Sequence, residues 1–515
     1  MRQTISVPIV FRSVVLFICC LVTAQTGAAP PMIIDVSRGT PINQMIRGYN
    51  YNVALPVGNP EWQSLHKIEE VLYRTSARGP SEGGSSQTYD WRTLVDRQGG
   101  KGRTTLDFLR MMRDRDCEAI ISVNMNGTRA GLNRPEQLVK MAADWVYYLN
   151  HTLTTYRQGD EVPPGRDRKI LESLKWGEHD TLLAPHESPV KKVKYYEIGN
   201  ETGGEHPDPL TVVPGLVDRY NRLSRAVLAE DPAAKVGPCG WTSSTAYLAG
   251  VFADPTARVD FACYHPYGMM ANKTWGVYPK TPTGNTRLVV KYLCAIKNRQ
   301  RGRHQPMVDA LRKAGRPLTT PLAITEWNPG PWGGTSWQWS TMAHALATCE
   351  SMFIWAHYRE GPVFAASYFS EGGWLRSSTE TPKFQLFEAF RDHLGDYLIH
   401  FHNPGRDSPL RIYATRNKAT DKIVIWGLNF SEDRDQQIRA QLRNLPFAPS
   451  RITFIKLGRK GSRGTRLLDY IPNHTPDAQL SIGWTVSRLT DFDPNDFSLT
   501  CEGACISALI LEKAL

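Results

Sequence analysis

Two glutamates, each at the end of a strand-like run, are of the right type to do acid–base and nucleophilic chemistry together. Glu201 follows Asn200 after VKYYEIG (193–199), and Glu326 ends PLAITE (321–326). Hydrolysis of a glycosidic bond needs such a pair, because one carboxyl group protonates the leaving oxygen while the other attacks the anomeric carbon or activates water. We therefore predict Glu201 as the acid/base and Glu326 as the nucleophile.

Polar and aromatic residues near the other strand ends are candidates for binding a sugar. Asn200 offers an amide to the hydroxyl beside the reacting carbon, where hydrogen bonds strengthen in the transition state. Tyr267, or an arginine such as Arg74, is expected to keep the nucleophile ionised by donating hydrogen bonds to it. Further candidates are His265, Asn124, Trp327 and Trp374, the tryptophans as stacking faces for sugar rings. Loop packing, turn formation and core packing stay open as their alternative roles.

These residues have to be positioned by a repeating pattern of strands and helices. Eight strand-like runs alternate with helical patterns: QMIRGYN (44–50), VLYRT (71–75), EAIISVN (118–124), VKYYEIG (193–199), AKVGP (234–238), VDFACYH (259–265), PLAITE (321–326) and PVFAASYF (362–369). Such alternation is typical of parallel βαβ units, and eight of them predict an α/β fold, a (β/α)8 TIM barrel. In that fold the carboxyl ends of the strands converge on one reaction site. An open doubly wound sheet is the alternative.

The pattern divides the chain into three regions. Residues 1–29 combine a basic start, an apolar run and small-residue cleavage sites, which predicts a signal peptide and a secreted or periplasmic protein. Residues 30–402 form the predicted barrel. Residues 403–515 carry strand patterns without intervening helices, which predicts a C-terminal β-sandwich. MIIDVSRG (32–39) is a candidate to pair with that sandwich, and an uncleaved anchor is the alternative to the signal peptide.

The composition of the chain limits the kinds of partner that we expect it to bind. The formal charge is +11, and +9 without residues 1–29, but the basic residues are scattered, so we expect a carbohydrate partner and no nucleic acid. No later segment has eighteen uninterrupted apolar residues, so no membrane association is expected after signal removal. Of the cysteines, only Cys501 and Cys505 have a spacing that invites a local disulfide. No zinc pattern is present, so we predict neither a metal nor another cofactor, and the oligomeric state is left open.

The motifs resemble those of retaining glycoside hydrolases of clan A. Members of that clan carry Asn-Glu after the fourth barrel strand and the nucleophilic glutamate at the end of the seventh. Within the clan the chain is most similar to family 51, the α-L-arabinofuranosidase group, through YDWR (89–92), KYYEIGNE (194–201) and TPKFQLFEAFRDHLGD (381–396). The resemblance implies cleavage of polysaccharides or oligosaccharides by double displacement, with an α-L-arabinofuranosidase-like specificity.

Two segments depart from the family pattern where the sugar subsite is lined. They are RGYNYN (47–52) and YRTSARGPSEGG (73–84), and they leave the sugar specificity open. Two other functions also stay open: a carbohydrate-binding barrel that has lost turnover, and a polysaccharide lyase, which relies on a Tyr, His or Lys base. Both Glu201 and Glu326 are present, which favours hydrolysis, because a protein that only binds sugar has no need of two reacting carboxylates.

Overall fold

The structure is a computed structural model. It describes residues 30–51, 72–75, 112–113, 116–125, 135–152, 191–202, 209–241, 245–267, 285–330, 340–368, 375–376, 379–460, 464–469 and 482–513. The predicted signal peptide, residues 1–29, lies outside these ranges. Among the helices that are described, none combines the length and the apolar character needed to cross a membrane.

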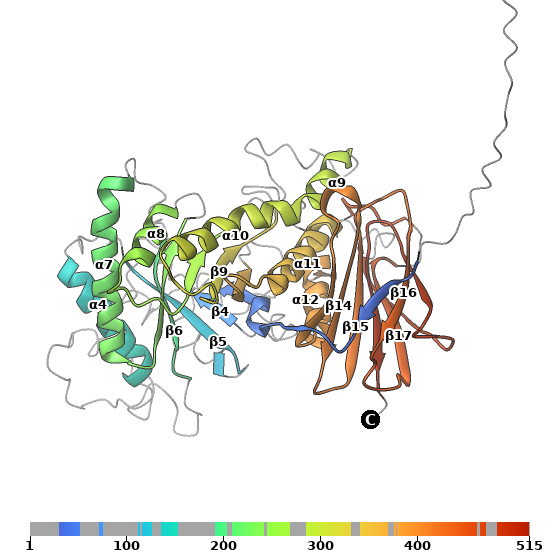
Figure 1. The fold of residues 1–515 in the computed structure, drawn as a ribbon, viewed down its shortest axis with the longest axis horizontal. Coiled ribbons are helices and arrows are strands. Elements are labelled where there is room, and N and C mark those ends of the chain that lie inside the picture. The colour runs from blue at the N-terminus through green and yellow to red at the C-terminus, as the bar shows by residue number, and fades with distance from the viewer. Residues whose placement is uncertain are drawn as a thin grey trace, which may run out of the picture.

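Eight parallel strands form the inner layer of the larger part of the molecule (Figure 1). They are β3 (Gly48–Tyr51), β4 (Leu72–Thr75), β5 (Glu118–Val123), β6 (Tyr195–Thr202), β7 (Lys235–Gly240), β8 (Ala262–Tyr264), β9 (Leu322–Trp327) and β10 (Val363–Tyr368). Each strand pairs with the next along the chain, and β10 pairs back onto β3, so the sheet closes on itself. Each strand overlaps one of the eight predicted runs.

Helices follow β5 to β10, which confirms the predicted α/β class. They are α4 (Pro135–Tyr147) with the π-helix η3 (Tyr148–Thr152), α7 (Pro209–Glu230), α8 (Thr245–Ala253), α9 (Arg287–Cys294), α10 (Ile296–Lys313), α11 (Met342–His357) and α12 (Pro382–His393). The connection after β3, and all but residues 112–113 and 116–117 of the connection after β4, lie outside the described residues. The outer helical layer is therefore described in part.

Mostly antiparallel strands form the second part, with a seven-stranded and a three-stranded sheet. The larger sheet contains β2 (Thr40–Pro41), β13 (Tyr397–His402), β14 (Leu410–Asn417), β15 (Lys422–Asn429), β17 (Arg451–Arg459), β18 (Ile482–Arg488) and β20 (Ile506–Glu512). The smaller contains β1 (Met32–Asp35), β16 (Gln436–Arg443) and β19 (Phe497–Cys501). Buried aliphatic residues of both sheets, among them Ile412, Ile425, Ile438 and Leu499, form one core between them.

The sandwich matches the sequence prediction at β1 but begins earlier in the chain than predicted. β13 lies before residue 403 but pairs with β14, so the sandwich begins earlier than predicted. β1 pairs in parallel with β16, so the N-terminal segment belongs to the smaller sheet, which is the pairing that the sequence offered for MIIDVSRG (32–39). The Cys501 and Cys505 thiols are buried and not joined, and the Cys505 sulfur lies 3.3 Å from Thr465 Oγ1. A local disulfide between them is therefore not present.

Two 3-10 helices and one short strand pair are also present among the described residues. They are the 3-10 helices η1 (Gln44–Arg47) and η5 (Gly405–Asp407) and the strand pair β11 (Leu375–Arg376) and β12 (Thr379–Glu380). Helices α11 and α12 lie between the barrel and the sandwich (Figure 1). Residues 342–356 of α11 are all buried, and the polar ones among them, such as His344 and Glu350, lie in the interior too.

Candidate active site

The two glutamates predicted to react lie close together at the carboxyl ends of β6 and β9. Glu201 Oε1 is 2.8 Å from Nδ1 of His265, and Glu326 Oε2 is 3.8 Å from the same nitrogen. One side-chain ligand atom from each of these three residues lies within 4.8 Å of the other two. The Glu201 side chain is 17% exposed and that of Glu326 is 7% exposed, so both are shielded and the former is the more open to solvent.

A bulge at the end of β6 directs Glu201 towards this cluster. In the pairing of β6 with β7, Ile198 lies opposite Pro238 but Thr202 lies opposite Gly240, so β6 has extra residues between these points. Glu201 has a φ of 50°, a conformation that non-glycine residues rarely adopt. Bulges of this kind re-aim a side chain at the edge of a sheet, and residues with unusual φ values cluster at functional sites.

Gly199 makes the bulge possible. Its φ is +85°, and a Cβ at this position would lie 2.3 Å from Thr202 Oγ1, so no larger residue fits without rearrangement. The Gly199 carbonyl also accepts a hydrogen bond from the Ser122 hydroxyl of β5 at 3.3 Å, which ties the bulge to the neighbouring strand. The glycine in YYEIGNE is thus a condition for the orientation of the glutamate.

A second bulge carries Glu326. Ile324 of β9 lies opposite Ala366 of β10, but Trp327 lies opposite Tyr368, so β9 has one residue more than β10 over this stretch. The irregularity lets Glu326 approach His265 and lets the preceding Thr325 reach the same ring, with its Oγ1 3.0 Å from Nε2. Both carboxylates that were predicted to react therefore lie where the strand ladder is interrupted.

Trp327 is placed in the core and not at the sugar-binding face that we predicted. Its side chain is 1% exposed. The ring packs edge-on against Trp355 of α11, with centroids 4.5 Å apart, and against Tyr368 of β10 at 4.9 Å. The bulge turns this residue outward to the helix layer, so Trp327 stabilises the outer wall instead of contacting substrate.

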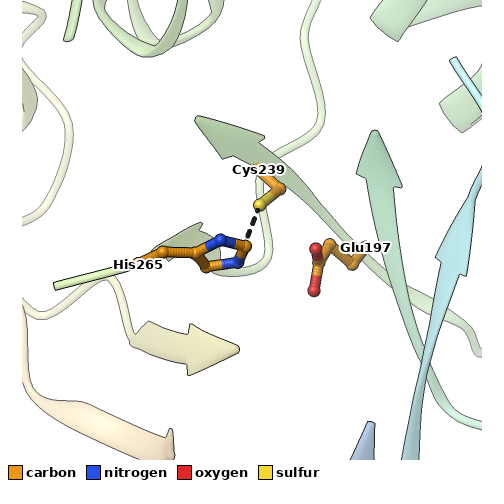
Figure 2. Close-up of side chains that lie close together, drawn as sticks. All are labelled: Glu197, Cys239 and His265. Atoms are coloured by element: carbon orange, nitrogen blue, oxygen red, sulfur yellow. Dashed lines mark hydrogen bonds between the residues drawn. The ribbon is translucent and has the colours of Figure 1, made fainter. Parts of the chain in front are cut away.

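His265 and Tyr267, which follow β8, connect the two carboxylates to the barrel interior. The Tyr267 hydroxyl donates a hydrogen bond to Glu326 Oε2 at 2.8 Å. His265 Nε2 faces the Cys239 sulfur at 3.5 Å, and Figure 2 shows these two side chains together with Glu197, whose carboxylate points towards them. His265, Cys239 and Glu197 are all buried. None of the three sits on the surface, and Cys239 and Glu197 were not among the predicted site residues.

The other predicted sugar-binding residues are placed as follows. Asn124 and Asn200 are buried at or next to the ends of the neighbouring strands β5 and β6, at 3% and 1% exposure. Arg74 lies on β4, but its side chain is outside the described residues. Trp374 is outside them altogether. The structure thus brings Glu201, Glu326, His265 and Tyr267 into direct contact.

A buried network of hydrogen bonds lies next to the end of β9, the strand that carries Glu326. Asn328 Oδ1 accepts a hydrogen bond from the Gly330 backbone at 2.7 Å and lies 3.0 Å from His344 Nε2 of α11. The Tyr368 hydroxyl lies 3.3 Å from the same nitrogen. Burial, with a smaller contribution from the nearby Lys383 ammonium, holds the pKa of His344 well below 6.5. A neutral ring therefore supports the loop that follows Glu326 across the physiological pH range.

Two groups of side chains in the described region have the donor types of a metal site. One is Glu201, His265 and Glu326, and the other is Glu197, Cys239 and His265. Carboxylate, imidazole and thiolate are ligands that zinc accepts, so the residues do fit a metal chemically. The first group coincides with the two carboxylates whose oxygens must stay free for glycosidic chemistry.

Replacing Tyr267 with phenylalanine is expected to lower kcat/KM for the glycoside hydrolysis predicted from the sequence by about 10- to 150-fold. The change removes a hydrogen bond to a charged group, which contributes about 1.5–3 kcal/mol. The phenyl ring keeps the packing, so the thermal unfolding temperature should stay within about 2 °C of wild type. Steady-state kinetics and a melting curve check both points, and an unchanged kcat/KM would show that the 2.8 Å contact to Glu326 does not serve the reaction.

Comparisons with known proteins agree with this geometry at the level of fold. No protein-family model matches the sequence, and no curated protein matches it significantly. An α-L-arabinofuranosidase from Thermotoga maritima, solved as an arabinose complex, is 16% identical and superimposes with a TM-score of 0.66, covering 94% of this chain and 100% of that one.

Two other solved structures give similar values. The family 51 arabinofuranosidase from Xanthomonas axonopodis pv. citri is 14% identical, with a TM-score of 0.65 over 93% of this chain and 99% of that one. A family 44 xyloglucanase from Paenibacillus polymyxa is 14% identical, with a TM-score of 0.59 over 93% and 99%. The chain therefore has the fold of solved glycoside hydrolases of families 51 and 44.

Proposed function

We propose that this protein is a secreted retaining glycoside hydrolase with a (β/α)8 TIM barrel as its catalytic domain. The observation that carries the proposal is the approach of Glu201 and Glu326, whose ligand atoms lie within 4.8 Å of each other at the carboxyl ends of β6 and β9. Carboxyl groups about 5–5.5 Å apart are typical of retaining enzymes, whereas inverting enzymes need about 6.5–9.5 Å to admit a water molecule. The short separation supports retention.

The surroundings of the two carboxyl groups support their roles. In the first step Glu326 attacks the anomeric carbon while Glu201 gives its proton to the leaving oxygen. In the second step Glu201 takes a proton from water, and this water attacks the glycosyl–enzyme ester and releases Glu326. The Tyr267 hydroxyl donates to Glu326, which favours its ionised form, and Glu201 is the more exposed, as a group that exchanges protons with incoming water should be.

The substrate we propose is a polysaccharide or oligosaccharide, with α-L-arabinofuranosides as the first candidates. Support for arabinofuranosides comes from the fold shared with arabinofuranosidases at 14–16% identity. The positive charge of the chain would also favour substrates that carry uronic acids or other anions. Screening aryl glycosides and polysaccharides separates these classes. Export is tested by the N-terminal sequence of protein recovered outside the cell, which is expected to begin near residue 30.

Replacing Glu201 with alanine tests the mechanism. Turnover of substrates with poor leaving groups should fall by about 10³-fold or more, because their oxygen needs a proton, whereas aryl glycosides with acidic phenols should lose much less. Added azide should restore turnover and give a glycosyl azide of retained configuration, since it attacks the intermediate without base assistance. NMR of the first product formed by the wild-type enzyme should show retained anomeric configuration.

The two alternatives predict different results. A carbohydrate-binding barrel without turnover would bind sugars but release no product from any glycoside. A polysaccharide lyase would produce an unsaturated sugar absorbing in the ultraviolet, and it would keep most of its activity without Glu326. An inverted anomer in the first product would contradict double displacement even if hydrolysis took place.

A further inference from the structure

We infer that Thr325 and Cys239 are positioning residues which hold His265 in the tautomer that carries its proton on Nδ1. This inference rests on the proposed function, because it concerns how the acid/base Glu201 is oriented. His265 is the group that touches both reacting carboxylates, at 2.8 Å and 3.8 Å from Nδ1. The ring nitrogen that carries the single proton therefore decides whether the two carboxylates face an N–H donor or a lone pair.

The contacts on the far side of the ring favour one tautomer. Nε2 lies 3.0 Å from Thr325 Oγ1 and 3.5 Å from the Cys239 sulfur. A hydroxyl donates or accepts, and a thiol is a weak donor and a weak acceptor. With Nε2 as an acceptor, both neighbours can direct their hydrogens to it. The proton then resides on Nδ1, where it is donated to Glu201.

The opposite tautomer is less well satisfied. A proton on Nε2 would find the Thr325 oxygen as an acceptor and the Cys239 sulfur as only a weak one. Nδ1 would then present a lone pair to Glu201 and Glu326, both carboxylates, which repel it whenever they are ionised. Since His265 is 1% exposed, water cannot compensate for such a mismatch.

A neutral ring also suits the reaction. A positive imidazolium 2.8 Å from Glu201 would favour the carboxylate form of a group that has to arrive protonated in the first step. A neutral Nδ1–H fixes Glu201 Oε1 as a hydrogen-bond acceptor and leaves Oε2 to carry the proton towards the leaving oxygen. Thr325 and Cys239 thereby act on Glu201 through His265 without touching substrate.

Matched substitutions test this assignment. Thr325→Val keeps the shape but removes the hydroxyl, and we expect kcat/KM to fall about 10-fold, as for the loss of one buried hydrogen bond. The high-pH limb of the kcat/KM profile should move towards higher pH, because ionised Glu201 loses a well-held donor. Thr325→Ser restores the hydroxyl and should recover both the rate and the profile to within about threefold.

Cys239 is the weaker of the two donors to His265 Nε2. Its effect on the rate should therefore become clear only when Thr325 is replaced as well. Cys239→Ala alone should change kcat/KM less than threefold, since a thiol is a weak donor. The double variant Thr325→Val/Cys239→Ala should fall below the product of the two single effects, because both of the described donors to Nε2 are then removed together. Thermal unfolding is followed in parallel. A rate loss with an unmoved pH profile would mean that Thr325 only packs, and would overturn the inference.

A spectroscopic readout separates this inference from the proposed function. In protein labelled with ¹⁵N-histidine, the His265 signals, identified by their loss in His265→Gln, should show a protonated Nδ1 and an unprotonated Nε2. This measurement needs no substrate, so it holds even if no glycoside is cleaved. Protonation at Nε2, or at both nitrogens, would refute the inference directly.

The donor set around Nε2 provides the last test. Glu197, Cys239 and His265 have ligand atoms within 4.8 Å of one another, an arrangement that Figure 2 shows and that zinc would also accept. Elemental analysis of the purified protein, before and after dialysis against Zn²⁺, is expected to find less than about 0.1 equivalent. One equivalent that is lost in Cys239→Ala would place a metal, and not a hydroxyl hydrogen, on Nε2 and would overturn the inference.

Discussion

Replacing Glu326 with glutamine is expected to reduce glycoside hydrolysis by about 10⁴-fold or more on every substrate, whatever its leaving group. The amide cannot form the glycosyl ester, so the first step of double displacement is lost, and removal of a reacting group costs at least about 5 kcal/mol of transition-state stabilisation. Unlike Glu201→Ala, this variant should show no gain with activated aryl glycosides. Steady-state kinetics with paired good and poor leaving groups make the comparison.

An exposed glutamate provides the control. Glu360 pairs with Arg312 at 2.8 Å on the surface and is 53% exposed, so Glu360→Gln makes the same chemical change away from the site and should leave kcat/KM unaltered. Mass spectrometry of wild-type enzyme trapped with a slow fluoroglycoside should place the sugar on the peptide that contains Glu326. Retained activity in Glu326→Gln would leave the nucleophile unassigned and the double-displacement proposal without its key residue.

The second large effect is expected in stability, at the junction of barrel and sandwich. Glu350 of α11 and Arg411 of β14 form an ion pair at 3.1 Å in which both side chains are 0% exposed. The carboxylate also accepts hydrogen bonds from Asn403 at 2.6 Å and from Tyr413. Burial and the adjacent Glu350 raise the pKa of Tyr413 well above 10, so its hydroxyl stays protonated and donates. Each of the two buried charges, on Glu350 and on Arg411, is therefore compensated by the other.

Arg411→Met should lower the free energy of unfolding by about 3–5 kcal/mol, because it leaves a buried carboxylate without its cation. The guanidinium also donates to the carbonyls of Gly405 at 2.7 Å and Cys294 at 3.3 Å, and these lose their donor too. The double variant Glu350→Gln/Arg411→Met removes both charges and should recover a large part of the loss. Denaturant titration followed by tryptophan fluorescence measures the difference.

The matched surface pair is Arg439 and Asp496, which has a similar distance of 2.9 Å but side chains 43% and 52% exposed. Arg439→Met should change stability little, since water replaces the contact. If Arg411→Met were equally mild, the junction would not depend on its buried charges. A fall in stability without loss of kcat/KM in the surviving folded protein is the expected pattern.

The sequence was most informative for the buried barrel strands and for the polar residues at their ends. The barrel strands were recognisable because their apolar runs are buried and recur at intervals filled by helical patterns. Glu201 and Glu326 stood out because each ends such a run. The structure places them together, and the contact of Tyr267 with Glu326 is the one that was expected.

Other features depend on pairing register, which a single sequence does not contain. The bulges at Gly199 and Thr325 arise from how β6 and β9 lie against their neighbours. A shift of one residue reverses the face of a side chain, which is why Trp327 was assigned to substrate but lies in the core. The contact of Thr325 with His265 was missed for the same reason, although its place next to Glu326 was a signal.

Two strands of the sandwich, β16 and β13, were difficult to assign from the sequence. β16 reads QQIRAQLR, in which Ile438, Ala440 and Leu442 are buried and the residues between them are polar. Alternation of this kind marks a strand with one solvated face, but the glutamines and arginines weaken the strand propensity. β13 was assigned to the barrel because it directly follows α12, and only its pairing with β14 places it in the sandwich.

The parallel pairing of β1 with β16 has a consequence for biosynthesis. Asp35 of β1 accepts a hydrogen bond from Asn444, which lies 409 positions later in the chain. During translation this first strand leaves the ribosome long before its partner exists, so its apolar residues Ile34 and Val36 have to wait without their final neighbours. Closure of so long a loop is entropically costly and slow. The N-terminal strand therefore cannot take its place in the sheet until β16 has been synthesised.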